Sequence, residues 1–214
     1  MKPLSGEKLE KELTRLEAMR EYEDTYDACA YICGIDEAGR GPLAGPVVAA
    51  AAVLPKDCQI FYLNDSKKLS EKKRDLLFDE IKEKAVAYGI GIVSPQVIDE
   101  INILQATYEA MRQAISQLNV IPEILLNDAV TIPGVDIMQV PIVKGDAKSV
   151  SIAAASILAK VTRDRMMMEY DQIYPEYGFA KHKGYGTAAH IAALKEYGPC
   201  PIHRRTFIKK FVTV

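Results

Sequence analysis

The 214-residue sequence contains no tryptophan and no long apolar segment. Its longest uninterrupted apolar run covers only residues 47–54, whereas a helix needs roughly 20 apolar residues to span a bilayer. The first 24 residues also lack the apolar stretch of a secretory signal. We therefore expect a cytoplasmic protein with no membrane association.

Cysteine and histidine are scarce, with four and three residues. The cysteines form no CxxC pair, and neither residue type shows the spacing of a zinc site. We expect reduced thiols and no zinc, and we expect His190 to lie on the surface of a helix. The hydrophobic share of 49% and the charged share of 26% are typical of one globular domain of this length.

The chain also has no large excess of positive or negative charge, since its formal net charge is −2. This average hides an asymmetry: residues 141–214 carry 12 basic and 6 acidic side chains, so the remainder is strongly acidic. A basic C-terminal third suits an anionic partner docked on one face. A chance gradient among solvated surface charges explains the same numbers equally well.

The chain divides into a charged segment and a domain. Residues 1–28 carry 13 charged side chains, and leucines at positions 9, 13 and 16 form one narrow apolar stripe. We predict a helical extension there and a single domain over 29–214. Three strands come early, and helices and strands then alternate, which favours an α/β fold with a mixed sheet and helices on its faces. The predicted strands are 31–36, 46–54, 87–93, 123–127 and 137–143, and the predicted helices begin near Ser70, Ser94, Ser149 and Thr187.

Carboxylates follow several of these strands. Asp36 and Glu37 end the first strand, Asp128 ends the fourth and Asp146 follows the fifth. If they converge at one sheet edge, their repulsion requires protonation or a bound cation. Oxygen donors without nearby His or Cys favour Mg²⁺ or Mn²⁺. Two such ions are the usual arrangement for phosphodiester hydrolysis.

A simpler explanation exists for each carboxylate taken singly. Aspartates commonly form turns or cap helices, and Asp146 stands just before a predicted helix. Glu37 points to the opposite face from Asp36 unless the strand turns there.

Two glycine-containing segments indicate substrate contacts. Gly39-Arg40-Gly41 exposes backbone N–H groups that can approach a sugar or phosphate closely. Residues 181–187 place cations and Tyr185 beside a helix start, which suits phosphates and stacking; an ordinary solvated loop is the alternative. Further candidates for phosphate contacts are Lys67, Lys148, Arg163, Arg165, Lys181 and Lys183.

Five motifs together resemble bacterial ribonuclease HII over residues 31–205. They are GIDEAGRGPLAGPVVAAAAVL, DSKKLS, LLNDAV, KGDAKSVSIAAASILAKVTRD and HKGYGT. The resemblance implies a ribonuclease H-like fold with a central five-stranded mixed sheet. It also implies hydrolysis of the RNA strand of RNA–DNA hybrids, and incision 5′ to single ribonucleotides embedded in duplex DNA. Cleavage is expected to leave a 3′ hydroxyl and a 5′ phosphate, with two Mg²⁺ or Mn²⁺ ions as cofactors. We also expect the protein to act as a monomer, in ribonucleotide excision repair and DNA replication.

Carried over residue by residue, the family's carboxylates fall on Asp36, Glu37, Asp128 and Asp146. Its ribonucleotide-sensing turn, which contacts the ribose 2′-OH, falls on residues 39–41, and its junction tyrosine falls on Tyr185. Two rival functions remain open. A phosphatase with an aspartate nucleophile would need a DxDx[TV] strand end, which is missing here. A non-catalytic hybrid-binding module would gain nothing from negative charge concentrated against phosphate.

Overall fold

The computed structural model describes residues 4–212, so residues 1–3 and 213–214, at the ends of the predicted extension and domain, lie outside the described residues. Five strands form one sheet in the order β3-β2-β1-β4-β5. Their bounds are β1 Ile32–Ala38, β2 Val47–Val53, β3 Ala87–Val93, β4 Ile124–Asp128 and β5 Met138–Ile142. β1 pairs antiparallel with β2 and parallel with β4, while β2–β3 is antiparallel and β4–β5 is parallel. The predicted five-stranded mixed sheet is confirmed.

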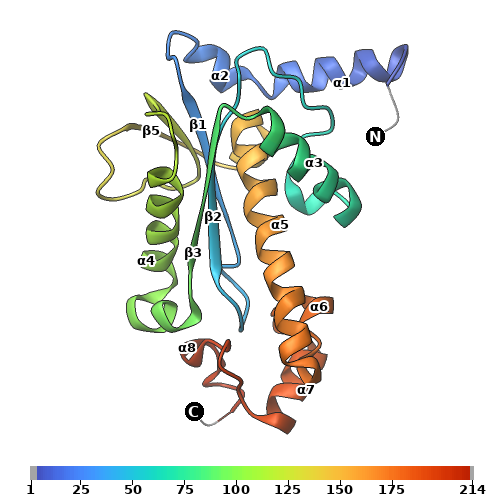
Figure 1. The fold of residues 1–214 in the computed structure, drawn as a ribbon, viewed down its shortest axis with the longest axis vertical. Coiled ribbons are helices and arrows are strands. Elements are labelled where there is room, and N and C mark those ends of the chain that lie inside the picture. The colour runs from blue at the N-terminus through green and yellow to red at the C-terminus, as the bar shows by residue number, and fades with distance from the viewer. Residues whose placement is uncertain (1–3, 213–214) are drawn as a thin grey trace.

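Helices cover both faces of this sheet (Figure 1). The long helix α5 (Val150–Ile173) packs with α3 (Glu71–Lys84) on one face, and α4 (Pro95–Ser116) packs on the other. Every residue of β2 is buried, and its side chains alternate between the two resulting cores. This is why the strand is continuously apolar, as expected for a strand with both faces covered.

The predicted helix starts are confirmed by their N-caps. The side chains of Ser70, Ser94, Ser149 and Thr187 each accept a backbone hydrogen bond from the first turn of the helix that follows. α4 is interrupted at Asn102, which has a positive φ of 67°. The last predicted helix is α7 (Ala188–Tyr197); the short helices α6 (Phe179–His182) and α8 (Arg205–Ile208) had no clear periodic signal in the sequence.

The N-terminal extension is two helices rather than one, α1 (Glu7–Ala18) and α2 (Glu21–Thr25). Leu16 and Met19 join the core between β2, α3 and α5. The buried Glu23 carboxylate accepts hydrogen bonds from Ser149 Oγ at 2.6 Å and Ser151 N at 2.9 Å, at the start of α5. A carboxylate is favourable there because helix N-termini carry partial positive charge. The extension thus anchors the end of α5 that adjoins Asp146.

No helix among residues 4–212 is long and apolar enough to cross a membrane.

Candidate active site

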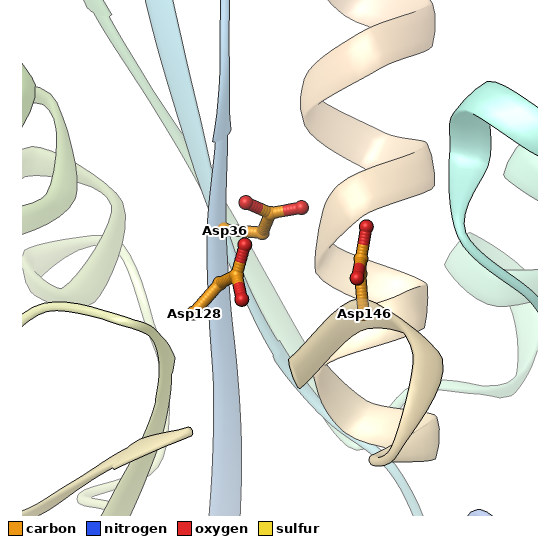
Figure 2. Close-up of side chains that lie close together, drawn as sticks. All are labelled: Asp36, Asp128 and Asp146. Atoms are coloured by element: carbon orange, nitrogen blue, oxygen red, sulfur yellow. The ribbon is translucent and has the colours of Figure 1, made fainter. Parts of the chain in front are cut away.

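Three aspartates converge at the sheet edge where β1 and β4 end. The two strands are parallel and Ile35 pairs with Asn127, so Asp36 and Asp128, one residue further along, lie side by side. Asp146 belongs to the single 3-10 turn Gly145–Ala147 that precedes α5. One carboxylate oxygen from each of the three lies within 4.8 Å of the others (Figure 2). The structure thus brings together three of the four carboxylates that the sequence singled out.

Backbone hydrogen bonds hold two of these side chains in place. Asp128 Oδ1 accepts from the N–H of Gly145 at 2.8 Å, which ties the end of β4 to the turn carrying Asp146. Asp36 Oδ1 accepts from the N–H of Glu37 at 2.7 Å. The carboxylates are therefore positioned by the fold before any ligand arrives.

Glu37 lies beside the cluster but is not part of it. Because β1 continues to Ala38, the strand does not end at Asp36, and the two neighbouring side chains diverge. The Glu37 carboxylate pairs with Arg40 at 3.3 Å. Its Oε2 atom is buried and has no hydrogen-bond partner among the described residues.

The electrostatics of the cluster disfavour ionised carboxylates. Burial, followed by the charge of Glu37, raises the pKa of Asp36 well above its usual range, and a hydrogen bond with Ser156 only partly opposes this. Burial also raises the pKa of Glu37, and burial together with the charges of Asp65 and Asp128 raises the pKa of Asp146. A bound cation would offset these effects and favour the ionised carboxylates.

The residues fit a divalent cation of the Mg²⁺ or Mn²⁺ kind. The donors are carboxylate oxygens, they converge to within 4.8 Å, and no histidine or cysteine takes part in the cluster found among the described residues. The unpartnered Oε2 of Glu37 offers one further buried oxygen at the same edge. Asp36, Asp128 and Asp146, with Glu37 adjacent, are the residues that would hold such ions.

We expect Mg²⁺ to stabilise the protein more at pH 7.5 than at pH 5. Ligand binding to the native state at about 100 times Kd adds about 2.7 kcal/mol, or a rise of roughly 5–10 °C in Tm for a chain of this size. Protons compete for carboxylates whose native pKa is raised, so the Mg²⁺-induced rise shrinks as pH falls through those pKa values. Thermal unfolding in EDTA and in Mg²⁺ at both pH values measures this; an equal rise at pH 5 and pH 7.5 would contradict it.

A cavity of about 250 Å³ opens beside the cluster and is lined by most of the predicted substrate contacts. Residues 39–41, Asp36, Glu37 and Tyr185 all line it, and 46% of the Tyr185 surface is exposed. Gly39 needs its φ of +95° to make the turn, and a Cβ there would lie 2.1 Å from Arg163 Nε.

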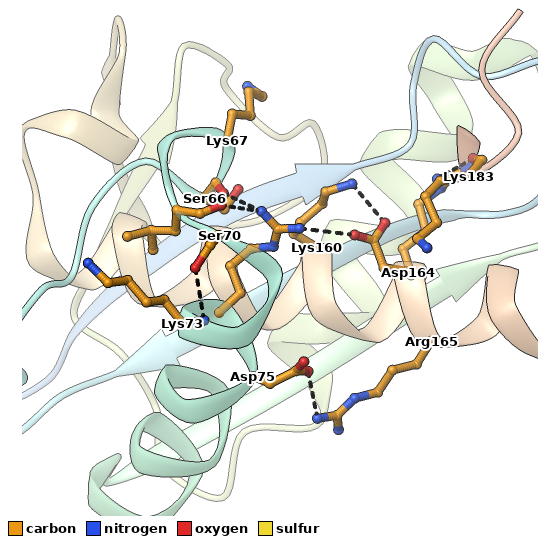
Figure 3. A network of polar contacts seen from close by, with 12 residues as sticks. Ser66, Lys67, Ser70, Lys73, Asp75, Lys160, Asp164, Arg165 and Lys183 are labelled. Carbon is orange, nitrogen blue, oxygen red and sulfur yellow. Dashed lines mark hydrogen bonds and ion pairs between the residues drawn. The ribbon is translucent and has the colours of Figure 1, made fainter. Parts of the chain in front are cut away.

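Lys67 reaches this cavity from the segment that precedes α3 (Figure 3). Partial burial acts to lower the pKa of Lys67, but the charges of Asp36 and Asp146, among others, outweigh it and raise the pKa. The segment is fixed by Arg74, which donates to the carbonyls of Ser66 at 3.1 Å and Leu69 at 2.6 Å.

Sequence analysis missed three residues on the cavity wall. The hydroxyls of Ser66 and Ser156 are hydrogen-bonded at 2.9 Å, and the Lys160 ammonium pairs with Asp164 at 2.7 Å (Figure 3). Ser156 and Lys160 are four residues apart on α5, which places both on the face toward Asp36. That spacing was the signal available in the sequence.

The interpretation of Arg163 as a direct phosphate contact is wrong. Arg163 has 0% of its surface exposed, and its guanidinium donates to the carbonyls of Pro46, Lys183 and Ala44 at 2.9–3.0 Å. Each of its three nitrogens therefore already donates to a carbonyl inside the protein. The predicted phosphate contacts of Lys148 and Lys181, both exposed, and of Lys183, half-buried, stay predictions. Arg165 pairs with Asp75 at 3.0 Å on the surface between α3 and α5.

The expectation that His190 lies on a helix surface is also wrong, since it is fully buried. His190 Nδ1 lies 2.9 Å from the Tyr185 carbonyl, which only accepts, so this nitrogen carries the proton. Nε2 of His190 then accepts from Nε2 of His203 at 3.0 Å, and Nδ1 of His203 accepts from the N–H of Cys200 at 3.0 Å. Burial lowers the pKa of both histidines, that of His203 to about 4, so both remain neutral and hold the Tyr185 backbone.

The mixed sheet and the three convergent aspartates at its edge are those of a divalent-metal-dependent nuclease with a ribonuclease H-like fold. The Ribonuclease HII family profile matches residues 33–210. A ribonuclease HII from Lachnoclostridium phytofermentans is 67% identical over 97% of this chain and 82% of its own length. One from Clostridioides difficile is 61% identical over 95% of this chain and 81% of its own length.

The fold agrees with these sequences. The crystal structure of the ribonuclease H2 from Pyrococcus horikoshii OT3 superposes with a TM-score of 0.69 at 31% identity, over 85% of this chain and 96% of that chain. The chain belongs to the ribonuclease HII family. It is an endoribonuclease, a hydrolase of the ribonuclease H type.

Proposed function

We propose that this protein hydrolyses the RNA strand of RNA–DNA hybrids and incises duplex DNA 5′ to single embedded ribonucleotides, by a two-metal-ion reaction that leaves 3′-hydroxyl and 5′-phosphate ends. The observation that carries the proposal is that the aspartate cluster and the cavity adjoin each other. Asp36, one of the three clustered aspartates, also lines the cavity bordered by the 39–41 turn and Tyr185. We expect a phosphate held at the aspartates to place its own ribose beside the turn and the next sugar near Tyr185.

Each part of the cavity has a distinct task in this reaction. When bound, the divalent ions supply positive charge for the phosphate oxygens and a nucleophile generated at neutral pH. The turn offers backbone N–H donors for the ribose 2′-OH, the group that separates RNA from DNA. Tyr185 presents an exposed side chain for stacking on the following sugar, and Lys67 and Lys160, which also line the cavity, supply positive charge for the anionic backbone.

The direct test uses an end-labelled DNA duplex that carries one ribonucleotide, incubated with Mg²⁺, Mn²⁺ or EDTA. We expect one metal-dependent nick 5′ to the ribonucleotide, no cut in an all-DNA duplex, and no cut by the Asp128→Asn variant. A folded wild-type protein that leaves the duplex intact in both metals would overturn the proposal and favour a non-catalytic hybrid-binding role.

Replacing Tyr185 by alanine is expected to lower kcat/KM on the single-ribonucleotide duplex by about tenfold, because one base- or sugar-stacking contact contributes roughly 1–3 kcal/mol. A continuous RNA–DNA hybrid is cut at many positions and depends less on this contact. The ratio of the two kcat/KM values is the measurement. An unchanged ratio would show that Tyr185 does not recognise the junction.

We further propose that one copy acts alone in the cytoplasm. The cluster, turn and tyrosine all come from one chain, and all four cysteines are free thiols, as in a reducing compartment.

A further inference from the structure

Two buried arginines flank the 39–41 turn and have no acidic partner. Arg163 and Arg204 each have 0% of their surface exposed, and neither forms an ion pair with any residue in the part of the chain described. Burial lowers the pKa of Arg163 to about 10 and that of Arg204 to about 9, so both guanidinium groups stay charged at neutral pH. Burying an uncompensated charge is costly, which indicates a task that a neutral side chain cannot perform.

The guanidinium of Arg204 donates its hydrogen bonds to carbonyls in and just after the turn. Its NH2 group donates to the Gly39 carbonyl at 2.6 Å, NH1 to the Arg40 carbonyl at 2.9 Å and Nε to the Gly45 carbonyl at 3.0 Å. In a trans peptide the C=O and the following N–H point in opposite directions. With the Gly39 and Arg40 carbonyls drawn toward Arg204, the N–H groups of Arg40 and Gly41 face away from it, and no acceptor among residues 4–212 uses them.

We infer that Arg204 is the positioning residue for ribonucleotide recognition: its guanidinium fork sets the two consecutive carbonyls so that two consecutive N–H groups stand free for the substrate. This inference rests on the proposed function, because it assigns the ribose as the occupant of those donors. Arg204 itself touches no substrate.

Arg163 braces the same turn from its other side. Its three nitrogens donate to the carbonyls of Ala44 and Pro46, which follow the turn, and to the carbonyl of Lys183, two residues before Tyr185. A Cβ on residue 39 would lie only 2.1 Å from the Arg163 Nε, so the arginine packs against Gly39 because that residue has no side chain. The pair thereby fixes the turn relative to the tyrosine segment as well as to the core.

The chemistry requires arginine at position 204. Only a planar fork reaches two adjacent carbonyls at once, whereas a lysine ammonium is a point donor. The Phe207 ring lies beside the fork, with its centroid 5.2 Å from the guanidinium carbon. The Asp99 carboxylate accepts from the N–H groups of Arg205 at 2.7 Å and Thr206 at 2.9 Å, and so fixes the start of α8 next to Arg204.

The test compares Arg204→Lys with wild type on two quantities. One is kcat and KM on the single-ribonucleotide duplex; the other is the inhibition constant of an all-DNA duplex of the same sequence, which has no 2′-OH. We expect kcat to fall about 10²-fold, as misplacement by about 1 Å does, while the inhibition constant changes less than twofold. Arg112→Lys is the matched control, because Arg112 donates to the Pro133 carbonyl far from the cavity.

The outcomes separate the inference from the proposed function. Wild-type protein that does not nick the duplex refutes the proposed function. Wild-type protein that nicks, with Arg204→Lys within twofold of it, overturns the inference alone. If Arg204→Lys loses kcat and all-DNA binding in parallel, the inference is also overturned, because such a result indicates general destabilisation of the protein.

A second variant keeps the inference testable if Arg204→Lys does not fold. Asp99 lies near the surface, and Asp99→Ala releases the start of α8 without touching either arginine. We expect kcat on the ribonucleotide duplex to fall several-fold with all-DNA inhibition unchanged. No change in kcat for this variant would count against the inference.

Discussion

Replacing Asp36 by asparagine is expected to abolish cleavage, because the loss of even one preorganised polar group at a reacting centre lowers kcat by about 10²–10³-fold. Asparagine keeps the shape of the side chain and its backbone hydrogen bond from Glu37. What disappears is the negative charge that, together with Asp128 and Asp146, would hold the cation. Nicking of the single-ribonucleotide duplex in Mg²⁺ and Mn²⁺ measures the loss.

The same substitution is expected to stabilise the protein when metal is absent. The pKa of Asp36 is raised in the native state relative to about 3.9 in the unfolded chain. The native state therefore holds this proton more tightly, and its stability falls as pH rises from about 4 through the raised pKa. Asparagine carries no such penalty, so its Tm in EDTA at pH 7.5 should exceed that of wild type, and the gap should close toward pH 4.

Added Mg²⁺ should reverse this order, because wild type gains binding energy that the variant lacks. Asp79→Asn, an exposed carboxylate on α3, is the control and should change neither activity nor Tm. Full activity of a clean Asp36→Asn preparation would refute the assignment of the metal site. A variant that is less stable than wild type in EDTA would refute the electrostatic account.

Sequence patterns predicted the parts of this molecule that depend on local or periodic signals. The strand bounds of β3 and the N-caps of four helices follow from alternation and capping chemistry. The meeting of Asp36, Asp128 and Asp146 follows from strand-end positions once β1, β4 and β5 are parallel neighbours. These signals lie within a few residues of the side chains they position.

The remainder depends on contacts between distant segments. Arg204 reads in the sequence as part of a solvated basic tail, yet it contacts carbonyls more than 150 residues earlier in the chain. His190 stands on a helix whose burial is decided by His203 and Phe179, neither of which periodicity can place. Glu37 depends on whether β1 stops at Asp36, and its pairing with β2 carries it on to Ala38.

Replacing Gly34 by alanine is expected to cost at least about 3 kcal/mol of stability, the upper part of the range for overpacked cores, which is roughly 6–12 °C in Tm for a chain of this size. A Cβ at this position would lie 2.0 Å from the backbone carbon of Ser151 and 2.3 Å from the nitrogen of Ile152. These are main-chain atoms in the first turn of α5, so no rotamer change relieves the clash and the helix must move away from β1.

That movement also connects stability to the active site. Asp36 follows Gly34 by two residues on the same face of β1, while Asp146 and Ser156 move with α5. The variant should therefore lose Mg²⁺-induced stabilisation as well as Tm. Gly41→Ala is the matched control for thermal stability, because its Cβ would meet only Tyr185, at 3.9 Å. A Gly34→Ala protein with the Tm of wild type would show that α5 tolerates a displacement from β1, and the close packing of this strand against this helix would then not be what fixes the distance between the aspartates.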